Sequence, residues 1–316
     1  MKKSYLLSGT LALAVFLGAC QSEESAETTN TADNANPETE VAESYAVTDD
    51  LGNEVKLEEI PETVVSLIPS NTEILYALEE GDKLIGATDF DNYPEEALEV
   101  ERVSDSVKFN AERIIQLDPD IVLAYSTGGP TGLEVLEEAD IPVFVIESAA
   151  SFEDVYGDIE QIAQVMGVEE KGEELIASIQ GEIKDVQDKL AEVEQKKKAY
   201  IEISPLPEIY TTGDKTFQQE IMNHAQVENV FADLEGWPQL SEEEVVNRNP
   251  ELIFTTVSYV ENAVDEIKAR DSWSEIAAVQ NEQVFLLDSD ITSRPGPRIG
   301  EAVKLVAETA YPDLLK

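Results

Sequence analysis

The chain has 316 residues, of which 67 are Asp or Glu and 21 are Lys or Arg, so its formal net charge at pH 7 is −46. Such a charge argues strongly against binding to nucleic acid, or to an anionic membrane, through a basic face. The length beyond the N-terminal region, roughly 270 residues, exceeds what one hydrophobic core usually serves, so we expect two lobes.

The N-terminal residues have the layout of a secretory signal peptide. Met1-Lys2-Lys3 is basic, an apolar run from Leu11 to Leu17 follows, and small residues precede Cys20. This order predicts a signal peptide over residues 1–20, and the apolar run is too short to span a bilayer. Leu17-Gly18-Ala19-Cys20 also resembles the bacterial lipobox, which implies that Cys20 is lipidated and anchors the protein to the outer face of the cell membrane. The alternative is an ordinary secretion signal with an incidental cysteine.

Residues 21–44 have no apolar periodicity, and they hold several glutamates and aspartates but no Lys or Arg. A segment of this composition cannot bury enough apolar surface to offset the entropy that it loses on ordering. We therefore predict a disordered acidic tether between the lipid and the folded part.

Short apolar runs rich in β-branched residues predict strands in both halves of the chain. Those in the first half are residues 64–68, 84–88, 121–124 and 143–146, and those in the second half are 199–203, 252–256 and 284–287. A short helix is expected from Thr72 to Leu78, after the turn and cap residues Pro69-Ser70-Asn71. Continuous apolar strands that alternate with helices predict an α/β fold of parallel sheets covered on both faces.

The middle of the chain has apolar residues at helical spacing. One helix is expected from Phe152 to Met166, before Gly167, and a second from about Glu169 to Lys197. The second helix would be ~40 Å long, which is too long for a crossover within a small sheet. We predict that it joins the lobes as a strut, with a coiled-coil arm as the alternative. The predicted divisions are an N-terminal α/β lobe at 45–151, a helical connector at 152–198 and a C-terminal α/β lobe at 199–316.

A weak internal repeat favours two related lobes. Asn110-Ala111-Glu112-Arg113-Ile114-Ile115 runs into Pro119-Asp120-Ile121-Val122-Leu123, and Ser241-Glu242-Glu243-Glu244-Val245-Val246 runs into Pro250-Glu251-Leu252-Ile253-Phe254. In each copy a glutamate lies seven residues before a proline that opens an apolar strand. The alternative is chance similarity between two common helix–proline–strand joints, and the shared glutamate spacing favours the repeat.

Several segments of the predicted lobes carry a family resemblance through their order and spacing. They are Ser66-Leu67-Ile68-Pro69-Ser70-Asn71-Thr72-Glu73, Asp91-Asn92-Tyr93-Pro94, Asn110-Ala111-Glu112-Arg113-Ile114, Leu117-Asp118-Pro119-Asp120-Ile121-Val122, Trp237-Pro238-Gln239-Leu240-Ser241 and Arg294-Pro295-Gly296-Pro297-Arg298. From about Tyr45 to the C-terminus, the chain resembles the iron-siderophore and cobalamin class of substrate-binding proteins of ATP-driven (ABC) importers. The resemblance implies two α/β lobes joined by one long rigid helix, with the ligand cleft between the lobes.

Within this class the chain is most similar to the cobalamin-binding member. Phe90, Tyr125 and Trp237 fall where that member has aromatic residues in the cleft, whereas Ser106 stands in place of another of its tryptophans. A flat, largely uncharged corrin can be held by aromatic faces with few charges. The resemblance thus implies cobalamin or a related corrinoid as the ligand. Packing in the core of a lobe is the alternative for each aromatic residue.

Two arginines leave other ligands open. Arg294 and Arg298 flank Pro295-Gly296-Pro297, where they can bind an anionic ferric siderophore or pair with the many carboxylates. Arg294 is therefore a further ligand-binding candidate, and a ferric siderophore is the alternative ligand. Haem is a weaker alternative, with His224 as its ligand and Met222 or a tyrosine as partner, because a histidine on a helix surface is more often structural.

Glu112 and Glu243 match the family's paired glutamates, one in each lobe, which dock on arginines of the permease. A carboxylate and a guanidinium form a bidentate, charge-assisted pair. The resemblance implies the same partner here, and the repeat puts the two glutamates at equivalent positions. The alternative is that each is a solvated residue on a helix surface.

Other classes of function find little support in the residues. A single histidine excludes the zinc and manganese sites that use several histidines, so neither a metal nor a cofactor is expected. An enzyme is not expected either, because there is no Gly-x-Ser-x-Gly segment, Cys20 is the only thiol, and no carboxylate pair is singled out for glycosidase chemistry. Trp273 is expected in a core. We therefore predict a monomeric, extracytoplasmic solute-binding lipoprotein, and an adhesion or structural lipoprotein without a cleft is the alternative from another class.

Overall fold

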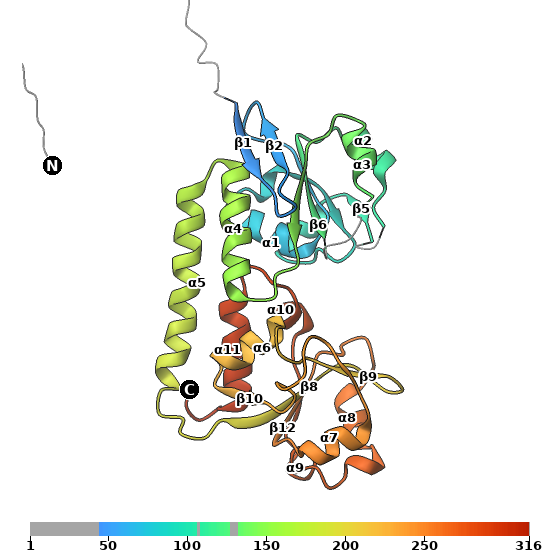
Figure 1. Ribbon diagram of the computed structural model, residues 1–316, viewed down its shortest axis with the longest axis vertical. Coiled ribbons are helices and arrows are strands. Elements are labelled where there is room, and N and C mark those ends of the chain that lie inside the picture. The colour runs from blue at the N-terminus through green and yellow to red at the C-terminus, as the bar shows by residue number, and fades with distance from the viewer. Residues whose placement is uncertain (1–43, 106–107, 127–131, 316) are drawn as a thin grey trace, which may run out of the picture. The chain divides into compact units, whose positions relative to one another are not determined.

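The computed structural model describes residues 44–105, 108–126 and 132–315. Their strands form two main sheets flanked by helices, so the predicted α/β class is confirmed. Strands β3 to β7 are all in one sheet and strands β8 to β13 are all in the other, so the sheets follow each other along the chain (Figure 1). Among the described helices, none combines the length and the apolar character that a membrane-spanning helix requires.

The first sheet is parallel and has the strand order β5-β4-β3-β6-β7. Its strands are β3 (Val64–Ser66), β4 (Leu84–Thr88), β5 (Arg102–Ser104), β6 (Ile121–Ser126) and β7 (Val143–Glu147). The helices that connect them are α1 (Pro69–Ala77), η1 (Gly81–Lys83), η2 (Glu95–Glu99), α2 (Ala111–Leu117) and α3 (Glu134–Glu137). An antiparallel hairpin of β1 (Tyr45–Thr48) and β2 (Glu54–Leu57) precedes the sheet. The strands predicted in this half are confirmed with small shifts of their ends, whereas β1, β2 and β5 were not predicted.

The second sheet has the order β11-β9-β8-β12-β13, and β10 pairs with the first part of β8. Its strands are β8 (Lys197–Ser204), β9 (Ile209–Thr211), β10 (Val227–Asn229), β11 (Gln239–Leu240), β12 (Leu252–Thr255) and β13 (Val284–Leu286). The helices of this half are α6 (Phe217–His224), α7 (Glu242–Arg248), α8 (Ala263–Lys268), η3 (Asp271–Trp273), α9 (Ala277–Gln280), α10 (Ser289–Ser293) and α11 (Ile299–Ala310). Trp273 is fully buried against Tyr200, so its predicted place in a core is confirmed.

The first predicted helix in the middle of the chain is confirmed as α4 (Phe152–Met166). It begins with a capping box, in which the Ser151 hydroxyl accepts from Asp154 N and the Asp154 carboxylate accepts from Ser151 N. It ends at Gly167, whose φ of 65° is the left-handed conformation that closes many helices. Both boundaries follow from local sequence, which is why the pattern predicts them.

The second predicted helix is α5 (Glu169–Lys189), and its expected end at Lys197 is wrong. Leu190 is the C-terminal cap and is buried, and Lys197 is already paired with Val227 as the first residue of β8. No Gly or Pro marks the end of α5 in the sequence, so the tertiary pairing of β8 overrides the helical pattern.

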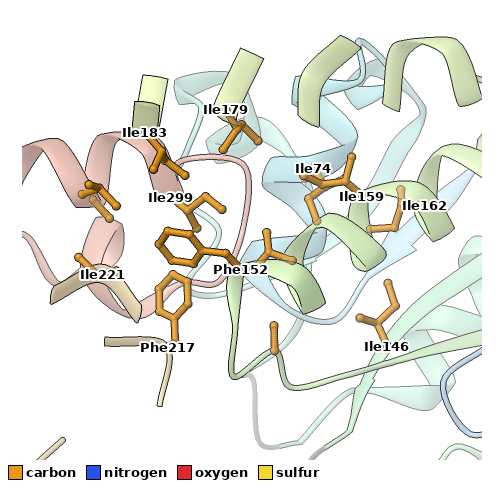
Figure 2. Packing of buried hydrophobic residues seen from close by; sticks show 14 of the residues in the cluster. Ile74, Ile146, Phe152, Ile159, Ile162, Ile179, Ile183, Phe217, Ile221 and Ile299 are labelled. Atoms are coloured by element: carbon orange, nitrogen blue, oxygen red, sulfur yellow. The ribbon is translucent and has the colours of Figure 1, made fainter. Parts of the chain in front are cut away.

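A layer of helices joins the two sheets through one continuous apolar cluster. In it α5 packs against both α4 and α11, and α11 also packs against α6. Figure 2 shows Ile179 and Ile183 of α5 near Ile299 of α11, and Phe152 of α4 beside Phe217 of α6. The rings of Phe152 and Phe217 are 5.9 Å apart between centroids. This packing is consistent with a joint formed by several helices, and a rigid strut role for α5 alone stays a prediction.

The internal repeat predicted from the sequence is present in the structure. Helices α2 and α7 both begin at a side-chain cap and both end at a left-handed residue, Asp118 in the first and Asn249 in the second. Each is followed by a buried proline and then by a central strand, β6 or β12. In each copy the acidic residue after the proline accepts a backbone N–H from the neighbouring strand region, Asp120 from Thr63 and Glu251 from Lys198.

Candidate ligand-binding cleft

A cavity of about 770 Å³ lies between residues of the first half of the chain and residues of the second half. Its lining includes Phe90, Tyr125 and Glu147 from the first half and Lys215, Phe217, Trp237 and Arg294 from the second. All of the residues predicted to bind ligand, namely Phe90, Tyr125, Trp237 and Arg294, therefore lie on the same cavity. Their contact with a ligand stays a prediction.

Phe90 reaches the cavity from the turn after β4. The Thr88 hydroxyl accepts a hydrogen bond from Phe90 N at 3.2 Å, and the Asp91 carboxylate accepts one from Thr88 N at 3.0 Å. Burial raises the pKa of Asp91, although hydrogen bonds from Thr88 and the charge of Arg102 oppose this. These bonds fix the backbone of Phe90 while 56% of its surface stays exposed, so its ring is available to a ligand.

Trp237 is placed by the segment that leads into β11. Gly236 has a φ of 71°, which favours glycine, and its carbonyl accepts a hydrogen bond from Gly213 N at 2.7 Å. Pro238 O accepts another from Thr211 N at 3.2 Å. Trp237 is 52% exposed, in contrast to the fully buried Trp273. Large aromatic surface that a fixed backbone leaves in water beside a cavity is typical of a binding site.

Arg294 lines the cavity, but acceptors from other segments already surround its guanidinium group. It lies 3.1 Å from Glu73 Oε1, 2.9 Å from Asp290 Oδ1, 2.8 Å from Asn92 Oδ1 and 3.0 Å from the carbonyl oxygen of Phe90. Arg294 therefore holds the backbone beside a cavity aromatic, and its positive charge is offset within the protein.

Arg298, the N-terminal cap of α11, approaches the same glutamate. Its Nε lies 2.7 Å from Glu73 Oε2 and its Nη2 lies 2.6 Å from Glu73 Oε1, while its guanidinium stacks 4.1 Å from the centre of the Tyr93 ring. Burial alone would lower the pKa of Arg298, but the hydrogen bonds and charge of Glu73 outweigh it and raise that pKa. The Glu73 side chain is only 1% exposed. We call Glu73, Arg294 and Arg298 the Glu73 clasp, because they tie α1 to the segment around α10 and α11.

The other cation on the cavity lining also has a carboxylate partner. Lys215 Nζ lies 3.0 Å from Glu235 Oε1 on the exposed surface. Glu147 adds a negative charge to the rim. Among the described residues that line the cavity, neither Arg294 nor Lys215 offers an uncompensated positive charge.

Comparison with known proteins places this geometry in a family. Residues 64–291 match the periplasmic binding protein family. The chain belongs to this family. Over its whole length it is 39% identical to the ABC transporter substrate-binding lipoprotein YvrC of Bacillus subtilis, of which it covers 99%. It is also 35% identical, over 78% of this chain and 88% of the relative, to a vitamin B12-binding protein of Vibrio parahaemolyticus.

Solved structures agree with this assignment. A possible iron-binding, periplasmic solute-binding protein of Staphylococcus epidermidis superimposes with a TM-score of 0.73 and 29% identity, covering 80% of this chain and 100% of its own. The family and these relatives are solute-binding proteins, so the chain is a solute-binding protein and not an enzyme.

The two docking candidates of this binding protein occupy equivalent places. Glu112 is the second residue of α2 and Glu243 the second residue of α7, and both side chains are exposed. Neither lines the cavity. Their position separates them from the ligand site, and their contact with a permease stays a prediction.

His224 does not line the cavity. The His224 ring stacks on Phe152 at 4.7 Å, and its Nδ1 is 2.8 Å from Gln187 Nε2, so it does not line the cleft. Burial lowers the pKa of His224. No group of His, Cys, Asp or Glu within the described ranges is arranged to hold a metal ion. Cys20, the tether at residues 21–44 except for Ser44, and Ser106 lie outside the described residues.

Sequence reasoning missed the partner of the two arginines and part of the cavity wall. Glu73 belongs to the segment Ser66 to Glu73, which carries the family resemblance, but nothing in the sequence shows that it faces Arg294, from which it is 221 positions away. Phe217 and Gln218 line the cavity from the start of α6. Their only signal was the Thr216 helix cap, which fixes where α6 begins.

Proposed function

We propose that this chain is an extracytoplasmic lipoprotein that binds cobalamin or a related corrinoid and delivers it to an ABC permease. The observation that carries the proposal is the chemistry of the cavity. Its lining includes the aromatic side chains of Phe90, Tyr125 and Trp237, and its two cations, Arg294 and Lys215, each pair with a carboxylate. Such a lining suits a flat ligand of low charge better than a polyanion.

The physical reasons concern area and desolvation. Aromatic side chains offer a large contact surface to a macrocycle, and Phe90 and Trp237 are each about half exposed before binding. A ligand that covers them removes apolar area from water without the need to desolvate a free charge. The vitamin B12-binding relative supports the same ligand class.

A ferric siderophore is the second candidate, supported by the neighbour from Staphylococcus epidermidis that is named as a possible iron-binding protein. An anionic siderophore would need Arg294 to leave Glu73 or Lys215 to leave Glu235, and only the second pair, which is exposed, opens at little cost. Displacing Arg294 would leave the buried carboxylate of Glu73 with Arg298 alone, which is costly. Haem is less favoured, because His224, the histidine expected to bind it, does not line the cavity.

The location and the permease partner complete the proposal. The relative YvrC is named as a lipoprotein and as an ABC transporter substrate-binding protein. We propose that a lipid on Cys20 and the tether at residues 21–44 hold this protein at the outer face of the membrane, and that Glu112 and Glu243 contact the permease. The cavity argues against an adhesion or structural role without a ligand.

Titration of the purified protein with cyanocobalamin tests the ligand. Of the two tryptophans, Trp237 lies on the cavity and Trp273 is fully buried, so only replacement of Trp237 should affect ligand binding. Trp237→Ala should weaken corrinoid binding by about 1–3 kcal/mol, from the aromatic area lost, as measured by calorimetry. Trp273→Phe is the matched control and should leave the affinity unchanged. Binding of a ferric siderophore with no binding of cobalamin would refute the proposal.

A further inference from the structure

A second cavity, of about 470 Å³, lies beside the first turns of α4. Its lining holds the carboxyl groups of Asp50, Glu147, Glu153, Asp154 and Asp158, and no Lys or Arg is among its described residues. Acidic residues alone do not make a site, because this protein carries a large excess of them everywhere. What distinguishes this cavity is that two polar groups on its lining are buried without hydrogen-bond partners among the described residues.

Two of the carboxylates are already used by the fold. Asp50 accepts hydrogen bonds from Gln161 Nε2 at 2.7 Å and from Glu147 N at 2.7 Å, and Asp154 belongs to the capping box of α4. Asp158 differs, because it is only 7% exposed, lines the cavity and has no hydrogen bond or ion pair with the residues that the structure describes. Gln161 Oε1 is likewise buried without a partner.

Gln161 Oε1 and the ionised carboxylate of Asp158 are hydrogen-bond acceptors, so both call for donors. Water can satisfy acceptors, but it does not offset a concentration of negative charge. A metal ion is not favoured, since no cluster of ligating residues in the described ranges is arranged to hold one. We infer that this cavity binds an organic cation with N–H donors, a primary ammonium or a guanidinium group, between Asp158 and Gln161.

The titration of Asp158 agrees with this geometry. Burial, reinforced by the negative charges of Asp50 and Asp154, raises the pKa of Asp158 to about 8. Glu147 and Glu153 line the same cavity and add to the negative potential. At neutral pH the unoccupied site therefore keeps Asp158 protonated, and a bound cation favours its ionised form. Binding at pH 7 should release a proton, and binding should tighten as pH rises through about 8.

The second cavity adjoins the ligand-binding cleft. The two cavities share the segment Glu147, Ser148 and Ala149 as part of their linings, so only this segment separates a cation in the second cavity from the cleft. The site is independent of the identity of the ligand in the cleft, and it can be tested without that ligand.

Agmatine, which carries one ammonium and one guanidinium group, is a suitable probe for calorimetry at pH 7 and constant ionic strength. We expect saturable binding with release of a proton, detected by comparing two buffers that differ in ionisation enthalpy. Asp158→Asn keeps the shape of the side chain and should weaken binding by about tenfold or more, because it removes a charged acceptor. It should also abolish the proton release.

A second variant tests the volume of the cavity without changing any charge. Gly157 lines the cavity within α4, and a Cβ atom added there would meet no atom within 4 Å, so Gly157→Leu fills space without a clash at its first atom. Leucine is also a better helix former than glycine, so folding should be preserved. We expect the same loss of agmatine binding, whereas Glu192→Gln, an exposed carboxylate elsewhere, should bind like the parent. Wild-type affinity in either cavity variant, or no saturable binding in the parent, would overturn the inference.

Discussion

The raised pKa of Asp158 predicts how the free energy of unfolding depends on pH, whether or not a ligand is bound. Its pKa in the folded protein is about 8, raised by burial and by Asp50 and Asp154, against 3.8 for the ordinary group. Between these values the folded protein holds a proton that the unfolded chain has lost, so the free energy of unfolding falls as pH rises from about 4 to about 8. Asp158→Asn removes this dependence and should stabilise the protein at pH 9 by on the order of 6 kcal/mol.

Urea unfolding of the parent and of Asp158→Asn at about pH 4, 7 and 9 measures the effect, because the difference between the two proteins isolates one group. Glu192→Gln is the control for loss of one surface charge in a protein with this net charge. Parallel pH dependences for the parent and Asp158→Asn would show that Asp158 is ionised in the folded state.

At the residue scale, the sequence predicted side chains better than it predicted their contacts. Phe90, Tyr125 and Trp237 were identified by a resemblance of short segments, and all lie on one cavity. The sequence does not decide whether Arg294 meets a siderophore or a carboxylate, because Glu73 contacts it only after the two halves of the chain come together. An ion pair between residues far apart in the chain leaves no pattern in the sequence, whereas helices and strands are marked by apolar periodicity and by capping residues.

At the element scale, boundaries set by local caps were predictable and those set by tertiary pairing were not. The bounds of α4 follow from the Ser151 capping box and from Gly167. The end of α5 does not, since the chain leaves the helix at Leu190 to supply the first residues of β8. The hairpin of β1 and β2 was also missed, although its strands alternate in burial as half-exposed strands do.

The Glu73 clasp joins elements from both halves of the chain, and breaking it should affect both stability and the cleft. Glu73→Gln leaves Arg294 and Arg298 buried without their shared carboxylate, and loss of one partner of a buried pair typically costs about 3–5 kcal/mol. Because Arg294 also binds the carbonyl oxygen of Phe90, we expect weaker binding of the cleft ligand as well. Chemical denaturation and ligand titration of the same variant measure the two effects.

The chain offers a matched control for this experiment. Glu202 is equally buried and accepts two hydrogen bonds from Arg270, at 2.7 and 2.9 Å, but it does not line the cleft. Glu202→Gln should therefore lower stability by a similar amount while ligand affinity survives. If both variants lower affinity equally at a temperature where both are folded, the clasp has no specific role at the cleft.

At the scale of the whole molecule, Glu112 and Glu243 are expected to act on association with the permease and not on the ligand. Charges at an interface rim chiefly set encounter rate and register, so Glu112→Ala or Glu243→Ala should weaken permease binding by on the order of 1 kcal/mol each. Ligand affinity should be unchanged, because neither residue lines the cavity. Added salt should reduce the difference between parent and variants.

Suitable controls are exposed acidic residues in the first turn of other helices, since they share the helix-dipole contribution of Glu112 and Glu243. Glu170 in α5 and Asp265 in α8 meet this requirement. Replacing either by Ala should leave binding to permease-containing vesicles near the parent value. If the control variants weaken binding as much as replacement of Glu112 or Glu243 does, association depends only on net charge and the docking assignment is wrong.

The most direct test of the account is competition among ligands for the cleft. Native mass spectrometry of the purified protein, offered cobalamin, cobinamide, haem and a ferric siderophore at equal concentration, reports which one it retains. The compensated cations and the three aromatic side chains on one cavity predict a corrinoid adduct, which Trp237→Ala diminishes. Retention of the ferric siderophore or of haem, with no corrinoid adduct, would contradict the account.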